Sequence, residues 1–549
     1  MISSRAFPFL FLGVTILVGC GDGAGPSDGT VDCSAVSPTV LGVGEHTIID
    51  AAAVGCVQLP AAGGGGAEHL YVALSGEGAE VRDGITAGYE LTATSPGVAA
   101  TAAPQAQASR AQVEPNAVVS FHDRVRSLER DLVARRGGAG PSTPAARVAA
   151  EPPAVGHQRS FKVCETADCD DFVDVAGTAQ VVGERVAIYL DDAAPPGGYT
   201  QEDLLRVGSL FDNYLHPIDT TAFGSESDLD DNDVVVVLLT ARVNNLRPNC
   251  NATNSIVVGY FFGLDLLPEE PNSNGGEVFY GLVPEPDNPT CTTGREQALA
   301  FLPGVFAHEF MHMIGFNQGV LQRGARSIEQ TWLDEGLAHF AEELAGRQVP
   351  DAECQPIFDT CESQFIEDNL GNAHLYLVDP EATFLIEPDT SSGDLPERGA
   401  NWLFVRWLAD HYAATQPLGT ELTRALVQTD LRGSANVEGA TGEAFDDLVA
   451  RWQLANYLED LPGFAPADET LHYSSWAFRE VYPSYPLVPD NTATGPYTHT
   501  GVLRGGSGQH LRIVQPGAAG PVTLRLTRDD GASALSDDAE PRVALIRIR

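Results

Sequence analysis

The chain has 549 residues, of which 43% are hydrophobic, and 32 Lys and Arg stand against 75 Asp and Glu, so its formal net charge at pH 7 is −43. This length predicts several structured units, and the charge excludes nucleic acid as the expected partner and opposes binding to anionic membrane surfaces. We interpret the charge mainly as a contribution to solubility.

Residues 1–19 have the pattern of an export signal, because Arg5 is followed by an apolar run from Phe7 to Val18 that is short for a membrane span. The run ends in Leu-Val-Gly-Cys, which resembles the bacterial lipobox and implies cleavage before Cys20 and acylation of that cysteine. Residues 20–30 are glycine-rich and predict a flexible tether. We expect an exported, membrane-anchored bacterial lipoprotein, periplasmic or on the cell surface, that contacts the membrane only through this lipid. A plain signal peptide cut nearby is the alternative.

The cysteine count agrees with export. There are nine cysteines, and assigning Cys20 to the lipid leaves eight that lie as near neighbours in sequence. Short-range pairs in an exported chain predict disulfides, although sequence alone allows other pairings and no CxxC spacing indicates a cysteine metal site. The simplest set is Cys33–Cys56, Cys164–Cys169, Cys250–Cys291 and Cys354–Cys361.

Changes in composition divide the rest of the chain into four parts. Residues 31–96 contain short β-type runs between glycine-rich turns and predict a small β-rich domain. Residues 97–160 have linker composition around an amphipathic helix at Ala117–Arg136, which we interpret as a spacer, or else as a pro-segment that docks on the next domain. Residues 161–462 mix strands and helices, and residues 463–549 predict a C-terminal β-rich domain.

The expected fold class is therefore a multidomain chain in which an α+β domain is flanked by small all-β units. In the α+β part, strands are expected before most of the helices. The predicted strands are Arg185–Leu190, Val234–Thr240 and Ser255–Phe262, and the predicted helices are Gln201–Tyr214, Pro303–Ile314, Thr331–Ala345, Ala400–Tyr412 and Ala444–Tyr457.

An HExxH motif lies at residues 308–312. Pro303 suits a first helical turn and Gly315 a helix end, so the motif is expected on one short helix. His308 and His312, four residues apart, then share a helical face and can meet one metal ion, while Glu309 can reach a water beside that ion.

A catalytic zinc site needs a third protein ligand and one open position. The next helical segment offers one, because Trp332, Glu335, His339 and Glu342 fall on one face at spacings of three and four. Glu335 follows His312 by 23 residues, which leaves room for a turn and an antiparallel return past the first helix.

The segment HEFMH followed by WLDEGLAHFAEEL resembles the gluzincin metallopeptidases, most closely the hyicolysin-type family, over residues 300–345 and more weakly at 399–408 and 445–452. The resemblance implies a zincin-like catalytic domain with one Zn²⁺, His308, His312 and Glu335 as ligands, and Glu309 as general base. It also implies hydrolysis of a protein or peptide substrate.

One position departs from the family pattern. Many gluzincins carry a carboxylate four residues after the glutamate ligand, where it orients a zinc histidine, and this chain has His339 there. Asp334 or Glu342 could take that role. The donor for the tetrahedral intermediate is also open, with His374 and Tyr376 as the nearest downstream candidates and Arg398 and His411 behind them.

The leading expectation is a lipid-anchored zinc metalloendopeptidase, and two alternatives stay open. WLDEGLA also resembles the aminopeptidase branch of the gluzincins, although no GxMEN-like segment lies upstream. A degenerate peptidase that acts as a surface binding or adhesion lipoprotein is the second alternative.

A calcium turn is a further candidate before the apolar run at 234–239. Asp228, Asp230 and Asn232 place oxygen side chains at alternate positions, but the segment lacks the glycine and the terminal glutamate of an EF-hand loop. We therefore favour a turn rich in Asp and Asn that leads into a strand.

Overall fold

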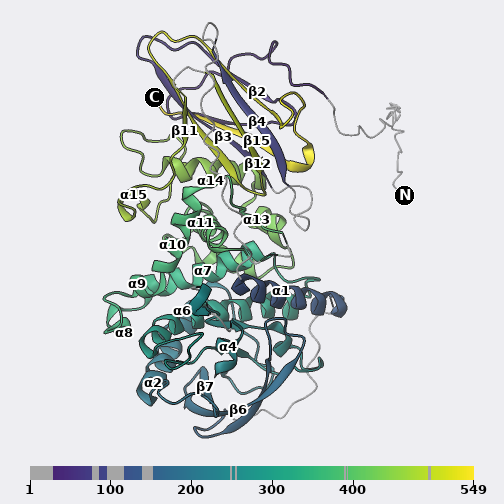
Figure 1. The fold of residues 1–549 in the computed structure, drawn as a ribbon, viewed down its shortest axis with the longest axis vertical. Helices are drawn as coiled ribbons and strands as arrows, with labels where there is room; N and C mark the ends of the chain where they lie inside the picture. The colour runs from purple at the N-terminus through teal and green to yellow at the C-terminus, as the bar shows by residue number, and fades with distance from the viewer. Residues whose placement is uncertain are drawn as a thin grey trace, which may run out of the picture.

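A β-sandwich and a second, mixed sheet lie at opposite ends of the molecule, with a helical layer between them (Figure 1). The computed structural model describes residues 29–76, 86–95, 117–138, 152–247, 250–253, 256–388, 391, 393–492 and 496–549. The predicted export signal, Cys20 and the expected tether up to residue 28 lie outside the described residues.

The sandwich takes strands from both ends of the chain. One sheet has the order β1-β15-β3-β13-β11 and the other β12-β4-β14-β2. The two flanking β domains that the sequence predicts at 31–96 and 463–549 are therefore a single domain. The strands are β1 (His46–Asp50), β2 (Cys56–Leu59), β3 (Ala67–Ser75), β4 (Ala87–Thr94), β11 (Asp490–Thr492), β12 (Tyr497–Leu503), β13 (Gly508–Gln515), β14 (Val522–Arg528) and β15 (Pro541–Arg547).

Strand β3 explains why the sandwich joins the helical layer. Successive side chains of a strand point to opposite faces. Tyr71 and Ala73 lie in the core between the two sheets, whereas Leu70, Val72 and Leu74 belong to the larger core that β3 shares with the helices. Every residue of β3 is buried as a result.

The second sheet has the order β5-β6-β7-β8-β10-β9. Strand β8 pairs in parallel with β7 and β10, and β9 closes the sheet as a short antiparallel edge strand. Its strands are β5 (Gln158–Cys164), β6 (Phe172–Val182), β7 (Val186–Asp191), β8 (Val235–Leu239), β9 (Gly259–Phe261) and β10 (Val278–Gly281). Mixed strands followed by helices agree with the α+β expectation for this part of the chain.

In the helical layer, α7 packs between α6 and α11, and α14 packs against β3 and β15. The helices before residue 330 are α1 (Ala117–Arg136), α2 (Gln201–Leu210), α3 (His216–Ala222), α4 (Ala241–Asn245), α5 (Cys250–Thr253) and α6 (Arg295–Phe316). Those after it are α7 (Thr331–Gln348), α8 (Asp351–Cys354), α9 (Cys361–Phe365), α10 (Glu367–Val378), α11 (Leu395–Tyr412), α12 (Thr420–Val427), α13 (Gly433–Thr441), α14 (Phe445–Leu458) and α15 (Phe478–Val481). Short 3-10 turns lie at Gly263–Leu266, Glu469–Leu471 and Asp537–Ala539, and π turns at Phe211–Leu215 and Asn317–Gln322.

Helix α1 forms where the sequence predicts it, but it is not a free spacer. Phe121, Val125, Leu132 and Val133 are buried in the core shared by the helices and the second sheet. In Figure 1 the helix lies across the front of the α6 and α7 region. The helix is therefore docked on the neighbouring domain, as in the second of the two interpretations of the sequence.

The structure contains the four sequential disulfides, Cys33–Cys56, Cys164–Cys169, Cys250–Cys291 and Cys354–Cys361. Within the described residues, the segment Arg295–Gln322 is long and apolar enough to cross a membrane, and 72% of an 18-residue apolar window in it is buried inside the protein. Such burial is typical of a core helix.

A chain that begins at residue 96 should lose the fold of its C-terminal strands. It lacks β3, which pairs with both β13 and β15, so these two strands lose their common partner. We expect amide hydrogen exchange in peptides covering residues 508–547 to approach that of the unfolded chain. The control is the full chain carrying one engineered protease cut between residues 96 and 116, where β3 stays paired and protection should persist. Equal protection in the truncated chain would contradict a shared sandwich.

Candidate metal centre

Helix α6 carries the first two candidate ligands. It begins at Arg295, so Pro303 lies inside the helix rather than in its first turn, and Gly315 does not end it. An interior proline removes one backbone hydrogen bond. Burial of most of the helix, from Ala298 through Phe316, offsets this cost. Local sequence preference does not include such burial and therefore places the proline in the first turn.

Helix α7 carries the third candidate ligand and approaches α11 closely. A Cβ atom at Gly336 would lie 2.8 Å from the carbonyl oxygen of Asn401 and 2.9 Å from Val405, so only glycine fits this crossing without a shift. The crossing brings Arg398, at the start of α11, to the centre, where its Nη1 lies 3.4 Å from Oε2 of Glu335.

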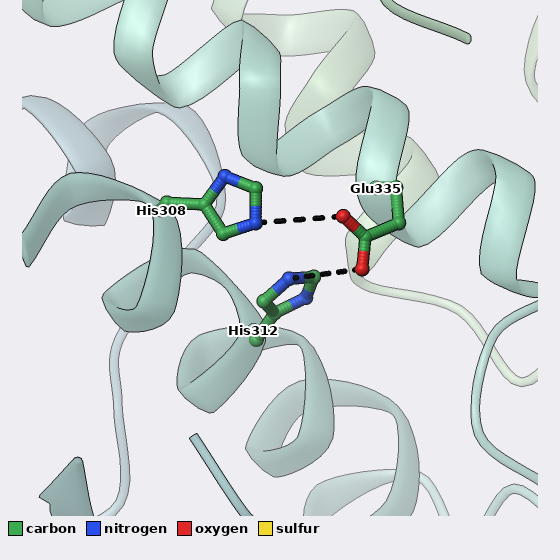
Figure 2. A group of neighbouring side chains, drawn as sticks. All are labelled: His308, His312 and Glu335. Atoms are coloured by element: carbon green, nitrogen blue, oxygen red, sulfur yellow. Dashed lines mark ion pairs between the residues drawn. The ribbon is translucent and has the colours of Figure 1, made fainter. Parts of the chain in front are cut away.

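His308, His312 and Glu335 point toward one another from two neighbouring helices (Figure 2). The Nε2 atoms of His308 and His312 lie 3.5 and 3.7 Å from the two carboxylate oxygens of Glu335. Two ligands about 2.0–2.1 Å from one tetrahedral zinc ion lie roughly 3.4 Å apart, so these spacings fit one ion. Oε2 of Glu335 is buried and makes ion-pair contacts with His308 and Arg398 but no hydrogen bond, so it can serve as a metal ligand.

A carboxylate lies beside the second nitrogen of each imidazole. Nδ1 of His308 is hydrogen-bonded to Oε1 of Glu342 at 2.8 Å, whereas Nδ1 of His312 lies 2.9 Å from Oδ2 of Asp334, an ion-pair distance without hydrogen-bond geometry. A metal-binding histidine commonly uses its second nitrogen in this way, which fixes the ring and directs the other nitrogen to the metal. Both carboxylates that the sequence offers in place of position 339 therefore lie beside a candidate zinc histidine, and Glu342 is hydrogen-bonded to its histidine.

His339 shares the carboxylate of Glu342 with His308. Its Nδ1 lies 3.2 Å from Oε2 of Glu342, and its ring lies 4.9 Å from that of His308. Burial alone would raise the pKa of Glu342, but the neighbouring imidazoles of His339 and His308 lower it to about 2. Glu342 is therefore ionised near neutral pH and positions two rings.

Glu335 is ionised as well. Burial opposes its charge, yet the guanidinium of Arg398 and the imidazoles of His308 and His312 hold its pKa well below the ordinary value. An anionic carboxylate with two oriented imidazoles is a donor set that suits zinc.

Glu309 lies beside this set, on the same helix as His308. Its Oε2 accepts a hydrogen bond of 2.7 Å from the backbone amide of Phe261, in edge strand β9. Only 4% of Glu309 is exposed. The strand edge therefore fixes the carboxylate that the sequence assigns as general base.

The structure does not bring the predicted downstream donors together at the centre. Tyr376 is buried in the core, stacks on Trp452 and interacts with Gln453 through its hydroxyl. The ring of His374 packs against Tyr482, and His411 bonds to a backbone carbonyl at residue 472. The sequence alone does not show whether an aromatic or imidazole side chain faces the core or a functional site.

The calcium candidate differs from the predicted set. Carboxylate oxygens of Asp228, Asp230 and Glu277 lie within 4.8 Å of one another, whereas Asn232 caps the backbone amide of Val234. Asp228 accepts from the amide of residue 232. These local bonds describe the Asx-type turn before strand β8 that the sequence favours.

Two groups at the centre escape sequence reasoning. Arg126 of α1 lies 3.6 Å from Asp334, and the backbone amide of Phe261 holds Glu309. Neither belongs to the HExxH segment or to the glutamate helix, and no local pattern marks them. Arg398, one of the downstream donor candidates in the sequence, contacts Glu335.

No protein-family model matches the chain. The chain is 30% identical over 145 residues to the neutral metalloprotease ShpI of Staphylococcus hyicus, a match that covers 26% of this chain and 31% of that protein. The chain thus spans about a third of the length of this curated relative. A crystal structure of an M1 zinc metallopeptidase from Deinococcus radiodurans aligns with 54% of this chain and 51% of its own, at 12% identity and a TM-score of 0.28.

The Glu342→Gln variant should bind zinc about 10–100-fold more weakly, because the side chain keeps its shape but loses the charge that orients His308. Competition with a chromogenic chelator measures this affinity. The matched control is Glu362→Gln, which removes an exposed carboxylate from α9 and should leave zinc affinity unchanged. Equal affinities in the two variants would rule out this role for Glu342.

Proposed function

We propose that this chain is a zinc metalloendopeptidase that hydrolyses peptide bonds in protein or peptide substrates. The observation that carries the proposal is the convergence of His308, His312 and Glu335, with a carboxylate beside the second nitrogen of each imidazole. The local identity to a neutral metalloprotease supports the same chemistry.

Zinc bound by these three residues would supply a Lewis acid that polarises the scissile carbonyl and lowers the pKa of water. In the proposed mechanism Glu309 takes a proton from the attacking water and passes it to the leaving amine. The amide of Phe261 keeps Oε2 of Glu309 in place during this transfer. The reaction consumes one water and yields a new carboxylate and a new amine.

Arg398 is better supported than Tyr376 or His374 as the group that stabilises negative charge at the centre. Its guanidinium contacts Glu335, and its side chain is 15% exposed, so solvent screens its charge little. A fixed cation beside developing negative charge is a common source of transition-state stabilisation.

We further propose that the enzyme is exported and held to a bacterial membrane through lipid on Cys20, with cleavage of residues 1–19. The lipobox-like sequence before Cys20 supports this. The four disulfides support an oxidising compartment, since such bonds persist outside the cytosol.

The Glu309→Gln variant should keep its zinc and lose activity by about 10²–10⁴-fold, because the amide cannot accept a proton from water. The assay is cleavage of an internally quenched peptide blocked at both ends, with zinc measured by elemental analysis. Glu296→Gln, an exposed position in the first turn of the same helix, serves as the control.

The blocked peptide also separates the competing functions. An aminopeptidase would cleave only the same peptide with a free amino terminus, and a degenerate binding protein would hold zinc without cleaving either form. Full activity in Glu309→Gln would eliminate the base assignment. A zinc chelator such as 1,10-phenanthroline should abolish cleavage, and added Zn²⁺ should restore it.

The Cys20→Ala variant should move from the membrane fraction to the soluble fraction when the gene is expressed in a bacterium, because the acylated thiol is absent. Immunoblotting of the two fractions measures the shift. Retention of the variant in the membrane fraction would count against lipid anchoring at this position.

A further inference from the structure

Edge strand β9 forms one side of the candidate centre, and its outer rim is occupied. The backbone carbonyl of Phe261 accepts a hydrogen bond of 3.1 Å from Nη2 of Arg126, and its amide donates to Glu309. The amide of Gly263, just beyond the strand, donates to Oε1 of Glu129 at 2.6 Å. Helix α1 thus uses two side chains to satisfy backbone groups along this rim.

Apolar contact strengthens the docking. The ring of Phe121 meets that of Tyr260 edge to face, with centroids 5.0 Å apart. Arg126 is 4% exposed and Glu129 is fully buried, and the two form an ion pair of 2.8 Å. The helix is therefore packed closely against the edge of the sheet.

The same helix extends to the metal-binding residues. Arg126 lies 3.6 Å from Asp334, the carboxylate that lies 2.9 Å from Nδ1 of His312. Burial lowers the pKa of His122 to about 3, and the charges of Arg398 and Glu335 also act on this imidazole, in opposite directions. The first half of α1 consequently lies next to the centre.

An exposed strand edge is the usual place for an extended peptide to bind, because its free amide and carbonyl groups pair with the peptide backbone. Beside Glu309, this edge of the chain offers the carbonyl of Phe261 and the amide of Gly263, and side chains of α1 occupy both, while the amide of Phe261 stays with Glu309. The helix is also separate in sequence from both neighbouring units, since β4 ends at Thr94 and β5 begins at Gln158. The stretches 96–116 and 139–151 that join it to them are rich in Ala, Pro and other residues typical of linkers.

We propose that helix α1 is an internal inhibitory segment, which occupies the rim of β9 where a substrate peptide would lie and must leave that rim before cleavage. This inference rests on the proposed peptidase function. It differs from removal of an N-terminal pro-domain, because the strands at 46–94 are integral to the sandwich. Release of α1 therefore requires displacement of the helix, or cuts on both of its sides.

The main experiment compares the full zinc-loaded chain before and after release of α1. Recognition sequences for a site-specific protease are placed within 96–116 and within 139–151, and the freed helix is separated by chromatography. We expect kcat/KM for a short blocked peptide to rise about tenfold or more, as when a competent state rises from a minor population. A synthetic peptide of residues 117–138 should restore the low rate.

Two further comparisons keep the test valid if the cut helix stays bound, or if cutting lowers the stability of the protein. In the intact chain, the double variant Arg126→Ala/Glu129→Ala should raise kcat/KM, whereas the charge-matched variant Asp131→Ala/Arg135→Ala, on the exposed side of α1, should not. The synthetic peptide with the first pair of changes should fail to inhibit. Fluorescence anisotropy of the labelled peptide measures its binding without any metal.

The outcomes separate this inference from the proposed function. If the uncut chain cleaves as fast as the helix-free chain, α1 does not inhibit and the inference is overturned. If the helix-free chain loses both zinc and activity, α1 is a permanent part of the site, which overturns the inference as well. If no form cleaves any peptide, a zinc-directed hydroxamate gives the answer by calorimetry. Binding about tenfold tighter to the helix-free chain would uphold the occlusion while the peptidase proposal fails, and equal binding would overturn the occlusion too.

Discussion

Buried charge must be paired, and this constraint organises the centre of the protein. A charged side chain removed from water is stable only when an opposite charge or hydrogen bonds replace its hydration, and removing one partner of a buried pair costs about 3–5 kcal/mol. The centre meets this demand with three sets of partners that come from α1, α6, α7 and α11. They are His308 with Glu342 and His339, His312 with Asp334, Arg126 and Glu129, and Glu335 with Arg398.

The position of α7 depends on a second buried carboxylate, farther along the same helix. Glu343 is fully buried and accepts hydrogen bonds from the indole nitrogens of Trp402 and Trp476 and from Arg347. These bonds join the end of α7 to α11 and to the segment that follows α14. Together with the close crossing at Gly336, these bonds fix the position of α7 along its axis, and with it the position of Glu335 relative to the two imidazoles.

Local patterns predicted the part of the site that lies on single helices. His308, His312 and Glu335, which converge in the structure, follow from helical spacing and from a short family resemblance, and the near-neighbour cysteines paired as expected. Contacts between distant segments were beyond this reasoning. Arg126 meets Asp334 across 208 positions, and no sequence pattern distinguishes a buried arginine on a docked helix from an exposed one on a spacer.

The same limit explains the error in the domain boundaries. Both β regions carry alternating patterns, which describe a half-buried strand but not its partner. Glu68 and Arg512 form an ion pair across 444 positions, and the helical body is inserted between the two groups of strands. The two β regions are separate in sequence, but their strands form one domain.

That insertion imposes an order on biogenesis. Strands β1 to β4 leave the ribosome long before β11 to β15 exist to pair with them. Non-local pairing of this kind slows folding, and unpaired strand edges attract other chains. The first strands therefore remain without these partners until the last residues have been synthesised. The sandwich is therefore complete only after the C-terminal strands have been synthesised.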